Sequence, residues 1–295
     1  MSEEAEAVAA SSCCASCGIA EIDDIKLMPC DDCDLVRYCG EECQSNHKSE
    51  HEEACKKRSD KLRDELLFQQ PESSCFGDCP ICCLPLPIEL KTSTIMGCCS
   101  KIICDGCFRA NWIREIEASI ALSCPFCRKP RPKSEQEHDK LRMKRVKAND
   151  PVAMHEQGRE EYKKGDFDRA FEYFTNAAAL GDAEAHYNLA ALYRRGEGVD
   201  KDEGKKIHHL EEAAIGGHPE ARYALGFNEM GNGNPERAVK HWIIAATLGH
   251  DDAMKKLMTL YKKGYVCKED IAATLRAHQV AVNATKSPQR KEAEE

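Results

Sequence analysis

Aromatic residues are scarce in this chain of 295 residues, where Phe, Trp and Tyr together make up 6%. So few large side chains argue against one large hydrophobic core and favour small modules or a repeat array. The chain also lacks any run close to the roughly 20 apolar residues that a bilayer span needs. Its first six residues are acidic and lack the apolar core of a signal peptide. We therefore expect an intracellular protein, cytoplasmic or nuclear, that makes no contact with membranes.

An excess of positive charge is also missing, because the formal net charge is -9. Binding to nucleic acid requires a basic surface that neutralises phosphates, so this class of partner is not expected. The one basic stretch, residues 128–147, has nine Lys or Arg against three acids. We interpret it as a solvated linker or helix face, with a nuclear signal or a phosphate-binding patch as the alternative.

Cysteine is nearly absent from the second half of the chain and abundant in the first. Of nineteen cysteines, eighteen lie between Cys13 and Cys127, and only Cys267 lies outside. Most of them form Cys-x-x-Cys pairs, which present two sulfurs to one metal ion. In a reduced intracellular compartment this pattern predicts zinc sites rather than disulfides.

The first group of candidate zinc ligands contains eight residues. They are Cys14, Cys17, Cys30, Cys33, Cys39, Cys43, His51 and Cys55. The spacing of the last three residues suits one face of a helix. Their order and spacing, with Tyr38 before Cys39 and Gln44 after Cys43, resemble the MYND zinc finger.

The resemblance to MYND fingers implies two interleaved zinc sites. Cys14, Cys17, Cys39 and Cys43 would hold one ion, and Cys30, Cys33, His51 and Cys55 would hold the other. Such a short module needs metal to fold. His47 has the wrong offset for a ligand, and we expect it to face solvent. In that family the finger binds short proline-containing peptides, which are therefore expected partners.

The second group runs from Cys79 to Arg128 and contains three Cys-x-x-Cys pairs and one Cys-Cys. The candidate ligands are Cys79, Cys82, Cys98, Cys99, Cys104, Cys107, Cys124 and Cys127. Their order resembles that of a RING finger, in which the two zinc sites are cross-braced. The resemblance implies one site made by Cys79, Cys82, Cys104 and Cys107.

The second RING site would use Cys99, Cys124, Cys127 and a fourth ligand two residues after Cys99. That residue is Lys101, whose ammonium has no lone pair and cannot bind zinc. Either Cys98 supplies the missing sulfur or the site is weak or metal-free, and we favour Cys98. The chain would then hold three or four zinc ions.

RING domains are mostly ubiquitin ligases without a nucleophile of their own. They position a ubiquitin-conjugating enzyme and its ubiquitin thioester. Matching this sequence to the family assigns the docking surface to Ile81, Trp112, Pro125 and Arg128. Each of these residues also has an ordinary alternative role, in the small core of the module or on its basic surface.

A repeat begins where the cysteines end. Asn149, Gly181, Gly217 and Gly249 recur every 32 to 36 residues, each followed four residues later by Ala. Gly or Asn ends a helix in the left-handed conformation, so each unit predicts two antiparallel helices. The pattern resembles Sel-one-like repeats, relatives of the tetratricopeptide repeats, which stack into a solenoid that binds proteins. The segment from Lys140 to Ala148 is a candidate first helix of this solenoid.

The histidines of the repeats lack a catalytic partner at useful spacing. We expect them to lie on the surface; they are His208, His209, His241 and His250.

The predicted fold is mainly α, with two small zinc-stabilised modules, MYND and cross-braced RING, followed by an α-helical solenoid of Sel-one-like repeats. The predicted domains are a disordered tail 1–12, the MYND-type finger 13–55, a helical linker 56–74, the RING-type finger 75–131, the repeats 132–285 and a disordered tail 286–295.

The leading functional prediction is a RING-type ubiquitin-protein ligase that selects substrate proteins with its MYND and repeat modules. The alternative is a non-enzymatic, zinc-binding protein-protein interaction adaptor.

Overall fold

The computed structural model describes residues 13–22, 24–88 and 90–294, and the tail predicted at 1–12 lies outside this part. The chain is mainly helical and divides into two compact units, one ending at Gln69 and the other starting at Gln70. Each unit contains hydrophobic clusters of its own.

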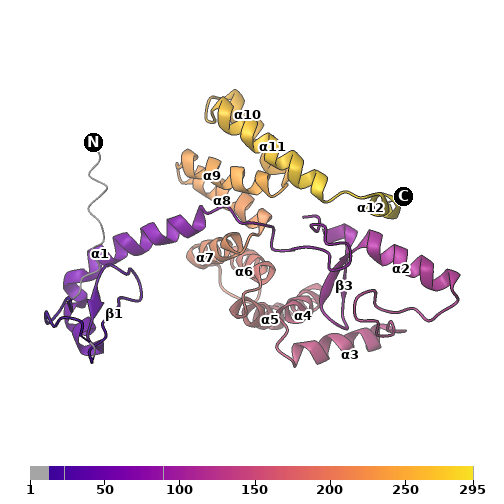
Figure 1. The fold of residues 1–295 in the computed structure, drawn as a ribbon, viewed down its shortest axis with the longest axis horizontal. Coiled ribbons are helices and arrows are strands. Elements are labelled where there is room, and N and C mark those ends of the chain that lie inside the picture. Colours follow the sequence, from indigo (N-terminus) through magenta and orange to yellow (C-terminus); the bar gives the residue numbers. More distant parts are fainter. Residues whose placement is uncertain (1–12, 23, 89, 295) are drawn as a thin grey trace. The chain divides into compact units, whose positions relative to one another are not determined.

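The N-terminal unit is a short hairpin followed by a long helix (Figure 1). Strand β1 (Met28–Pro29) pairs antiparallel with β2 (Arg37–Tyr38). Helix α1 (Glu41–Leu67) has 27 residues and contains no Gly or Pro that would interrupt it. It runs straight past residue 55, so the predicted helical linker begins as the second half of this helix.

The C-terminal unit begins with a cysteine-rich module. A 3-10 turn (Leu90–Thr92) leads into strand β3 (Ser93–Met96), which pairs antiparallel with β4 (Lys101–Cys104). Helix α2 (Asp105–Glu117) follows directly. The buried Glu115 carboxylate accepts hydrogen bonds from the Ser123 hydroxyl and backbone N–H, which fixes the loop before Cys124 against α2.

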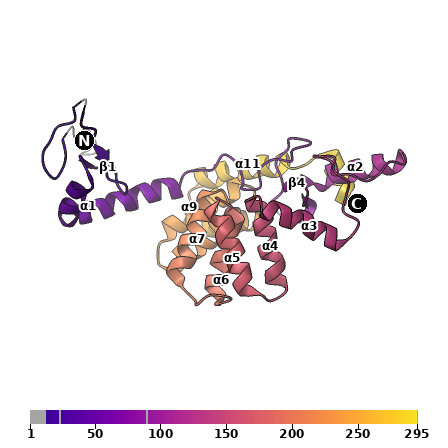
Figure 2. The same ribbon diagram turned by 90° about the horizontal axis from the view of Figure 1, so that it is seen from below.

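Most of the remaining helices form an antiparallel stack, in which α4 to α7 lie side by side in Figure 2, and α12 packs separately against α2. Their bounds are α3 Glu135–Val146, α4 Pro151–Lys163, α5 Phe167–Ala179, α6 Ala183–Arg195, α7 Glu203–Ile215, α8 Pro219–Gly231, α9 Pro235–Thr247, α10 Asp251–Lys262, α11 Lys268–Ala284 and α12 Pro288–Glu294. Neighbouring helices pair as α4 with α5, α6 with α7 and α8 with α9. The solenoid is therefore built from helical hairpins, as the repeat period predicts.

Within the described ranges, every helix is too short or too polar to cross a membrane.

Each hairpin begins at the same two-residue signal. Asn149, Gly181, Gly217 and Gly249 all have positive φ, which confirms the predicted left-handed stops. The residue after each one caps the next helix by accepting a hydrogen bond from a backbone N–H. These four caps are Asp150, Asp182, His218 and His250, which bond Ala153, Ala185, Ala221 and Ala253. One local rule therefore sets the register of the whole stack.

The two ends of the solenoid differ in how well the sequence predicts them. Much of the basic stretch forms α3, which packs on α4 and contributes the buried Arg142. The C-terminal segment 286–295, predicted to be disordered, instead contains the seven-residue helix α12 packed against α2. The polar composition of this segment does not predict a helix, because the contacts that stabilise α12 come from residues about two hundred positions earlier.

Candidate zinc centres

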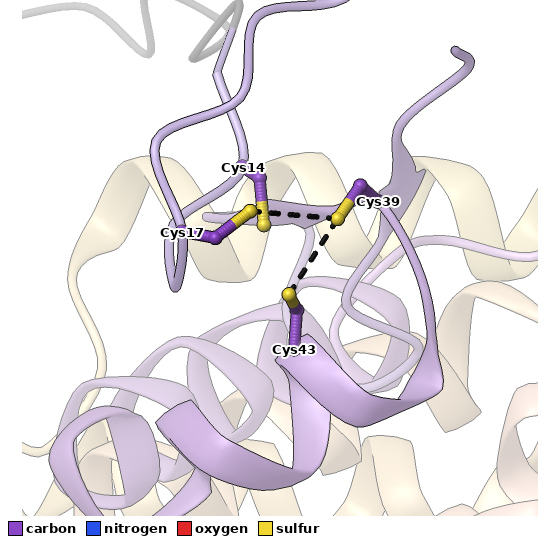
Figure 3. A group of neighbouring side chains, drawn as sticks. All are labelled: Cys14, Cys17, Cys39 and Cys43. Carbon is purple, nitrogen blue, oxygen red and sulfur yellow. Dashed lines mark hydrogen bonds between the residues drawn. The ribbon is translucent and has the colours of Figure 1, made fainter.

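The structure gathers the predicted ligands into four groups, in each of which the ligand atoms lie within 4.8 Å of one another. The groups are Cys14, Cys17, Cys39 and Cys43 (the first MYND site); Cys30, Cys33, His51 and Cys55 (the second MYND site); Cys79, Cys82, Cys104 and Cys107 (the first RING-like site); and Cys98, Cys99, Cys124 and Cys127 (the second RING-like site). In both modules the groups interleave along the sequence. Figure 3 shows the four thiols of the first MYND site converging from two loops and from α1.

The distances between ligand atoms suit tetrahedral zinc. A Zn–S bond of about 2.3 Å implies an S···S distance of about 3.8 Å at the tetrahedral angle. The Cys17–Cys39 and Cys39–Cys43 sulfur pairs of the first MYND site are each 3.5 Å apart. In the second MYND site the Cys30 and Cys55 sulfurs are 3.7 Å apart.

The RING-like module, residues 75–131, shows the same spacing. The Cys82 and Cys104 sulfurs are 3.8 Å apart in the first RING-like site. In the second RING-like site the Cys99 and Cys124 sulfurs are 3.9 Å apart. All nineteen cysteines are free of disulfides. These donor sets fit zinc.

Four of the five Cys-x-x-Cys pairs, all but Cys104–Cys107, share a left-handed turn. Gly18, Asp34, Cys83 and Arg128 each follow a pair and each have φ between 55° and 75°. In three of these loops the N–H of this residue donates a hydrogen bond of 3.0 Å or less to the carbonyl of the first Cys. A left-handed non-glycine residue is costly, and these hydrogen bonds help to hold the loop closed in that conformation.

Backbone N–H groups also favour the thiolate form of the first cysteine in two pairs. Burial raises the pKa of Cys14, but hydrogen bonds from the backbone of Cys17, Cys39 and Ser16 lower it to about 6. In the RING-like module, burial raises the pKa of Cys79, but hydrogen bonds from the backbone of Cys82, Cys104 and Ile81 lower it to about 7. Thiolate is the form that binds zinc, so the loops are prepared for a cation.

His51 completes the second MYND site. The Nε2 atom of His51 lies 3.0 Å from the Cys33 sulfur. Burial, followed by the charge of His47, lowers the pKa of His51 and keeps its imidazole in the neutral, metal-binding form. The prediction that His47 faces solvent is wrong. It is half-buried, stacks on His51 with the ring centroids 5.8 Å apart, and lies 3.2 Å from the Tyr38 hydroxyl.

Cys98 lies where the fourth ligand of the second RING-like site is needed. Its sulfur is 3.3 Å from that of Cys127. Lys101 projects elsewhere, with its ammonium 5.9 Å from the centre of the Phe126 ring. Burial and the neighbouring thiols of Cys124 and Cys127 raise the pKa of Cys99 to about 11, against a hydrogen bond from the Lys101 backbone, so a bound cation would be needed to keep these sulfurs ionised together.

Three of the four predicted docking residues lie at the surface of the RING-like module. Ile81 and Trp112 are 42% and 41% exposed, and Arg128 is exposed and donates a hydrogen bond to Asn111. Pro125 differs from the prediction, because it is buried inside the last Cys pair. Its neighbour Phe126 is 43% exposed instead and is the apolar side chain that this loop presents.

A fifth group of possible metal ligands, formed by Cys75, Glu184 and His218, serves another purpose. The Nδ1 atom of His218 accepts the Ala221 N–H, so the proton of the neutral ring is on Nε2, which lies 3.1 Å from Glu184. A protonated nitrogen cannot bind a metal. The same arrangement recurs at His250, which caps α10 and donates from Nε2 to Glu220 over 2.9 Å. We therefore assign both histidines to the helix caps.

The predicted surface position of the repeat histidines is thus wrong for two of them. His250 is buried by its capping role, and His241 is buried within α9. His209 is half-buried in a cluster with His186 and Tyr193, and His208 is exposed as expected.

Comparison with known families identifies two of the three regions. Residues 14–55 match the MYND finger, and residues 153–182, 183–218 and 219–250 match the Sel1 repeat. The RING-like module is identified by the geometry of its two cysteine groups.

Several curated proteins are similar to parts of the chain. Chitin synthase regulatory factor 4 of Schizosaccharomyces pombe is 33% identical over 89 residues, which are 30% of this chain and 14% of that protein. DAP3-binding cell death enhancer 1 is 25% identical over 173 residues in Mus musculus and 31% identical over 168 residues in Rattus norvegicus. These alignments cover 45% and 43% of this chain but only 34% and 33% of the relatives.

Among solved structures, a Sel1 repeat protein from Oxalobacter formigenes is similar over 60% of this chain and 74% of that protein. The sequence identity is 26% and the TM-score 0.44. MYND fingers and Sel1 repeats are modules that bind other proteins. By the family matches, the chain contains a MYND finger and Sel1 repeats, together with cysteine and histidine groups that fit zinc.

Proposed function

We propose that this protein is an adaptor that brings two protein partners together, with zinc supplying the stability of its small modules. The observation that carries this proposal is the presence of two kinds of protein-interaction module on one chain. Each of them has a hollow that a peptide could occupy. The name of one similar protein, DAP3-binding cell death enhancer 1, also describes a binding role.

The first hollow lies on the MYND finger. It has a volume of about 530 Å³ and is lined by Gln44 and Lys48 and also by three residues of the second MYND site, Cys30, His51 and Cys55, so it opens beside that site. The family resemblance makes a proline-containing peptide its proposed ligand. The lining carries charged groups of both signs, including Glu41, Lys48 and Asp60, which suits a short peptide with polar flanks.

The second hollow lies between α6 and α8 of the solenoid and measures about 500 Å³. Tyr187, Tyr223 and the exposed Phe227 provide aromatic surface, and Arg194 provides an exposed charge. Aromatic and Arg side chains are enriched at the centres of protein interfaces. This groove is therefore the proposed seat of the second partner.

The adaptor proposal is tested by reversing one charge in the groove. Arg194→Glu should remove one set of proteins crosslinked to the full chain in cells and leave the set bound by the MYND finger. Arg276→Glu makes the same change on the exposed face of α11, outside this groove, and should leave both sets intact. Loss of no partner with Arg194→Glu, or equal losses with both variants, would count against a partner in the groove.

A second candidate function is RING-type ubiquitin ligation. The exposed Ile81, Trp112 and Phe126 support it, because an apolar surface beside two cross-braced groups is what the docking of a conjugating enzyme requires. Arg128, held by Asn111, is the proposed cation that would contact ubiquitin. Autoubiquitination with a panel of conjugating enzymes tests this candidate. Activity that is lost in Ile81→Ala would support it, and a zinc-loaded protein that is inert with the whole panel would contradict it.

A further inference from the structure

The C-terminal helix α12 lies over the first RING-like site, although nearly two hundred residues separate them in sequence. It packs against α2 (Figure 1), the helix that begins directly after Cys104 and contains Cys107. Gly106 lies between these two ligands, and a Cβ atom there would be 2.8 Å from the backbone nitrogen of Arg290. Only glycine at position 106 therefore allows the backbone of α12 to come so close to the metal ligands.

Both ends of this short helix are fixed. The Ser287 hydroxyl accepts a hydrogen bond from the Arg290 N–H at the first turn. At the other end, Arg109 on α2 donates from its guanidinium to the Glu292 carbonyl. A helix of seven residues is unstable in isolation, so these contacts with the zinc module keep it folded.

The side chain of Arg290 enters the zinc module and is only 7% exposed. Its NH1 donates to the Pro85 carbonyl over 2.6 Å, and its NH2 donates to the Leu84 carbonyl over 3.1 Å. The same NH2 lies 3.4 Å from the sulfur of the ligand Cys82. The sulfur of Cys104, a second ligand of the same site, lies 3.8 Å from that of Cys82.

A buried guanidinium needs negative charge nearby, because taking it out of water unpaired is costly. The partners described for Arg290 are carbonyl oxygens, which are neutral, and sulfurs, which are neutral as thiols and anionic as thiolates. Zinc with four thiolates carries a net negative charge. The position of Arg290 is thus favourable when Cys82 and Cys104 are ionised on a metal.

We propose that Arg290 stabilises zinc in the first RING-like site by neutralising its thiolates, so that the C-terminal helix locks this site. Arg290 acts on the metal through Cys82 and Cys104 and is therefore a positioning residue. Zinc retention at this site does not depend on which partners the protein binds.

The test compares three variants of the full chain. Arg290→Gln removes the charge, Arg290→Lys keeps it without the fork of donors, and Arg109→Gln loosens the far end of α12 without touching a sulfur. Zinc affinity is measured by competition with a chelator. Alkylation of the released thiols, followed by mass spectrometry, identifies which site has lost its metal.

Arg290→Gln should lower the zinc affinity of the first RING-like site by about 10- to 100-fold, the usual effect of removing a group that hydrogen-bonds a metal ligand. The MYND cysteines should keep their protection. Arg290→Lys should recover part of the loss, and Arg109→Gln should stay close to the wild type. In cobalt-substituted protein, the sulfur-to-metal charge-transfer bands should shift with Arg290→Gln and not with Arg109→Gln.

Wild-type zinc affinity in Arg290→Gln would overturn the proposal. Equal losses in Arg290→Gln and Arg109→Gln with unchanged cobalt spectra would also overturn it, since they would assign the effect to helix packing alone. If Arg290→Gln does not fold, the lysine variant decides. A loss there as large as that of a Cys82→Ser variant would contradict a role for the charge.

Discussion

The core of the MYND finger consists of cysteines together with Leu27 and Tyr38, whereas one core of the solenoid consists of alanines and leucines around the fully buried Trp242. The first core holds little apolar surface, and the second is packed so tightly that a Cβ atom at Gly226 would collide with the indole ring of Trp242. The two regions therefore reach stability differently. The cysteine modules depend on a metal ion that bridges distant loops, and the solenoid depends on small side chains that let helices approach closely.

Removing zinc should have the largest effect, and this effect should be confined to the cysteine modules. Structural zinc contributes on the order of 10 kcal/mol per site, more than a module of this size gains from its own core. Chelation should therefore raise hydrogen exchange throughout 13–55 and 75–131. The fluorescence of Trp242 should stay that of a buried indole, measured in a Trp112→Phe background so that it is the only reporter.

Two results would contradict this difference between the cysteine modules and the solenoid. Unchanged exchange in the cysteine modules after chelation would show that they fold without metal. Simultaneous exposure of Trp242 would show that the solenoid depends on zinc as well.

Crowding the solenoid core should produce a smaller loss. A Cβ atom at Gly226 would lie 2.4 Å from the indole nitrogen of Trp242, so Gly226→Ala should cost about 1–3 kcal/mol of unfolding free energy. Gly231→Ala is a matched control on the same helix, because nothing lies within 4 Å of the added atom. Thermal unfolding followed by circular dichroism measures both variants, and zinc content should stay constant. Equal melting temperatures for the two variants would contradict the tight packing.

Acid should weaken the solenoid slightly through its histidine caps. The hydrogen bond from His250 lowers the pKa of Glu220 below its ordinary 4.5, against the opposing effect of burial. A lowered pKa in the folded state means that this stabilisation is present above pH 4.5 and is lost as the pH falls through the folded value. The melting temperature should fall between pH 5 and pH 3, and by less in Glu220→Gln. Identical pH profiles for the two proteins would exclude this carboxylate as a source of acid sensitivity.

The sequence predicts most of what depends on local spacing. Cysteine spacing groups the ligands, and Gly or Asn followed by a capping residue marks every hairpin, because knuckles and helix stops are decided within a few residues. What it misses depends on distant contacts. Helix α12 forms because Arg290 and Arg109 bond groups far away in sequence, and His218 and His250 are buried because their rings substitute for the Asp caps of earlier repeats.

In the RING-like module the sequence predicts one feature correctly and misses another. The gap left by Lys101 identifies Cys98 as a candidate ligand, and the structure places its sulfur in the second RING-like group. The side-chain direction within the last pair could not be read from spacing, since Pro125 turns inward and Phe126 outward.

The central claim is that the chain carries four zinc sites, the least expected of which depends on Cys98. The direct measurement is the number of zinc ions per chain, counted by native mass spectrometry for the wild type and for Cys98→Ser. We expect four ions in the wild type and three in Cys98→Ser, with Lys101→Ala unchanged at four. Three ions in the wild type, or four retained in Cys98→Ser, would contradict it.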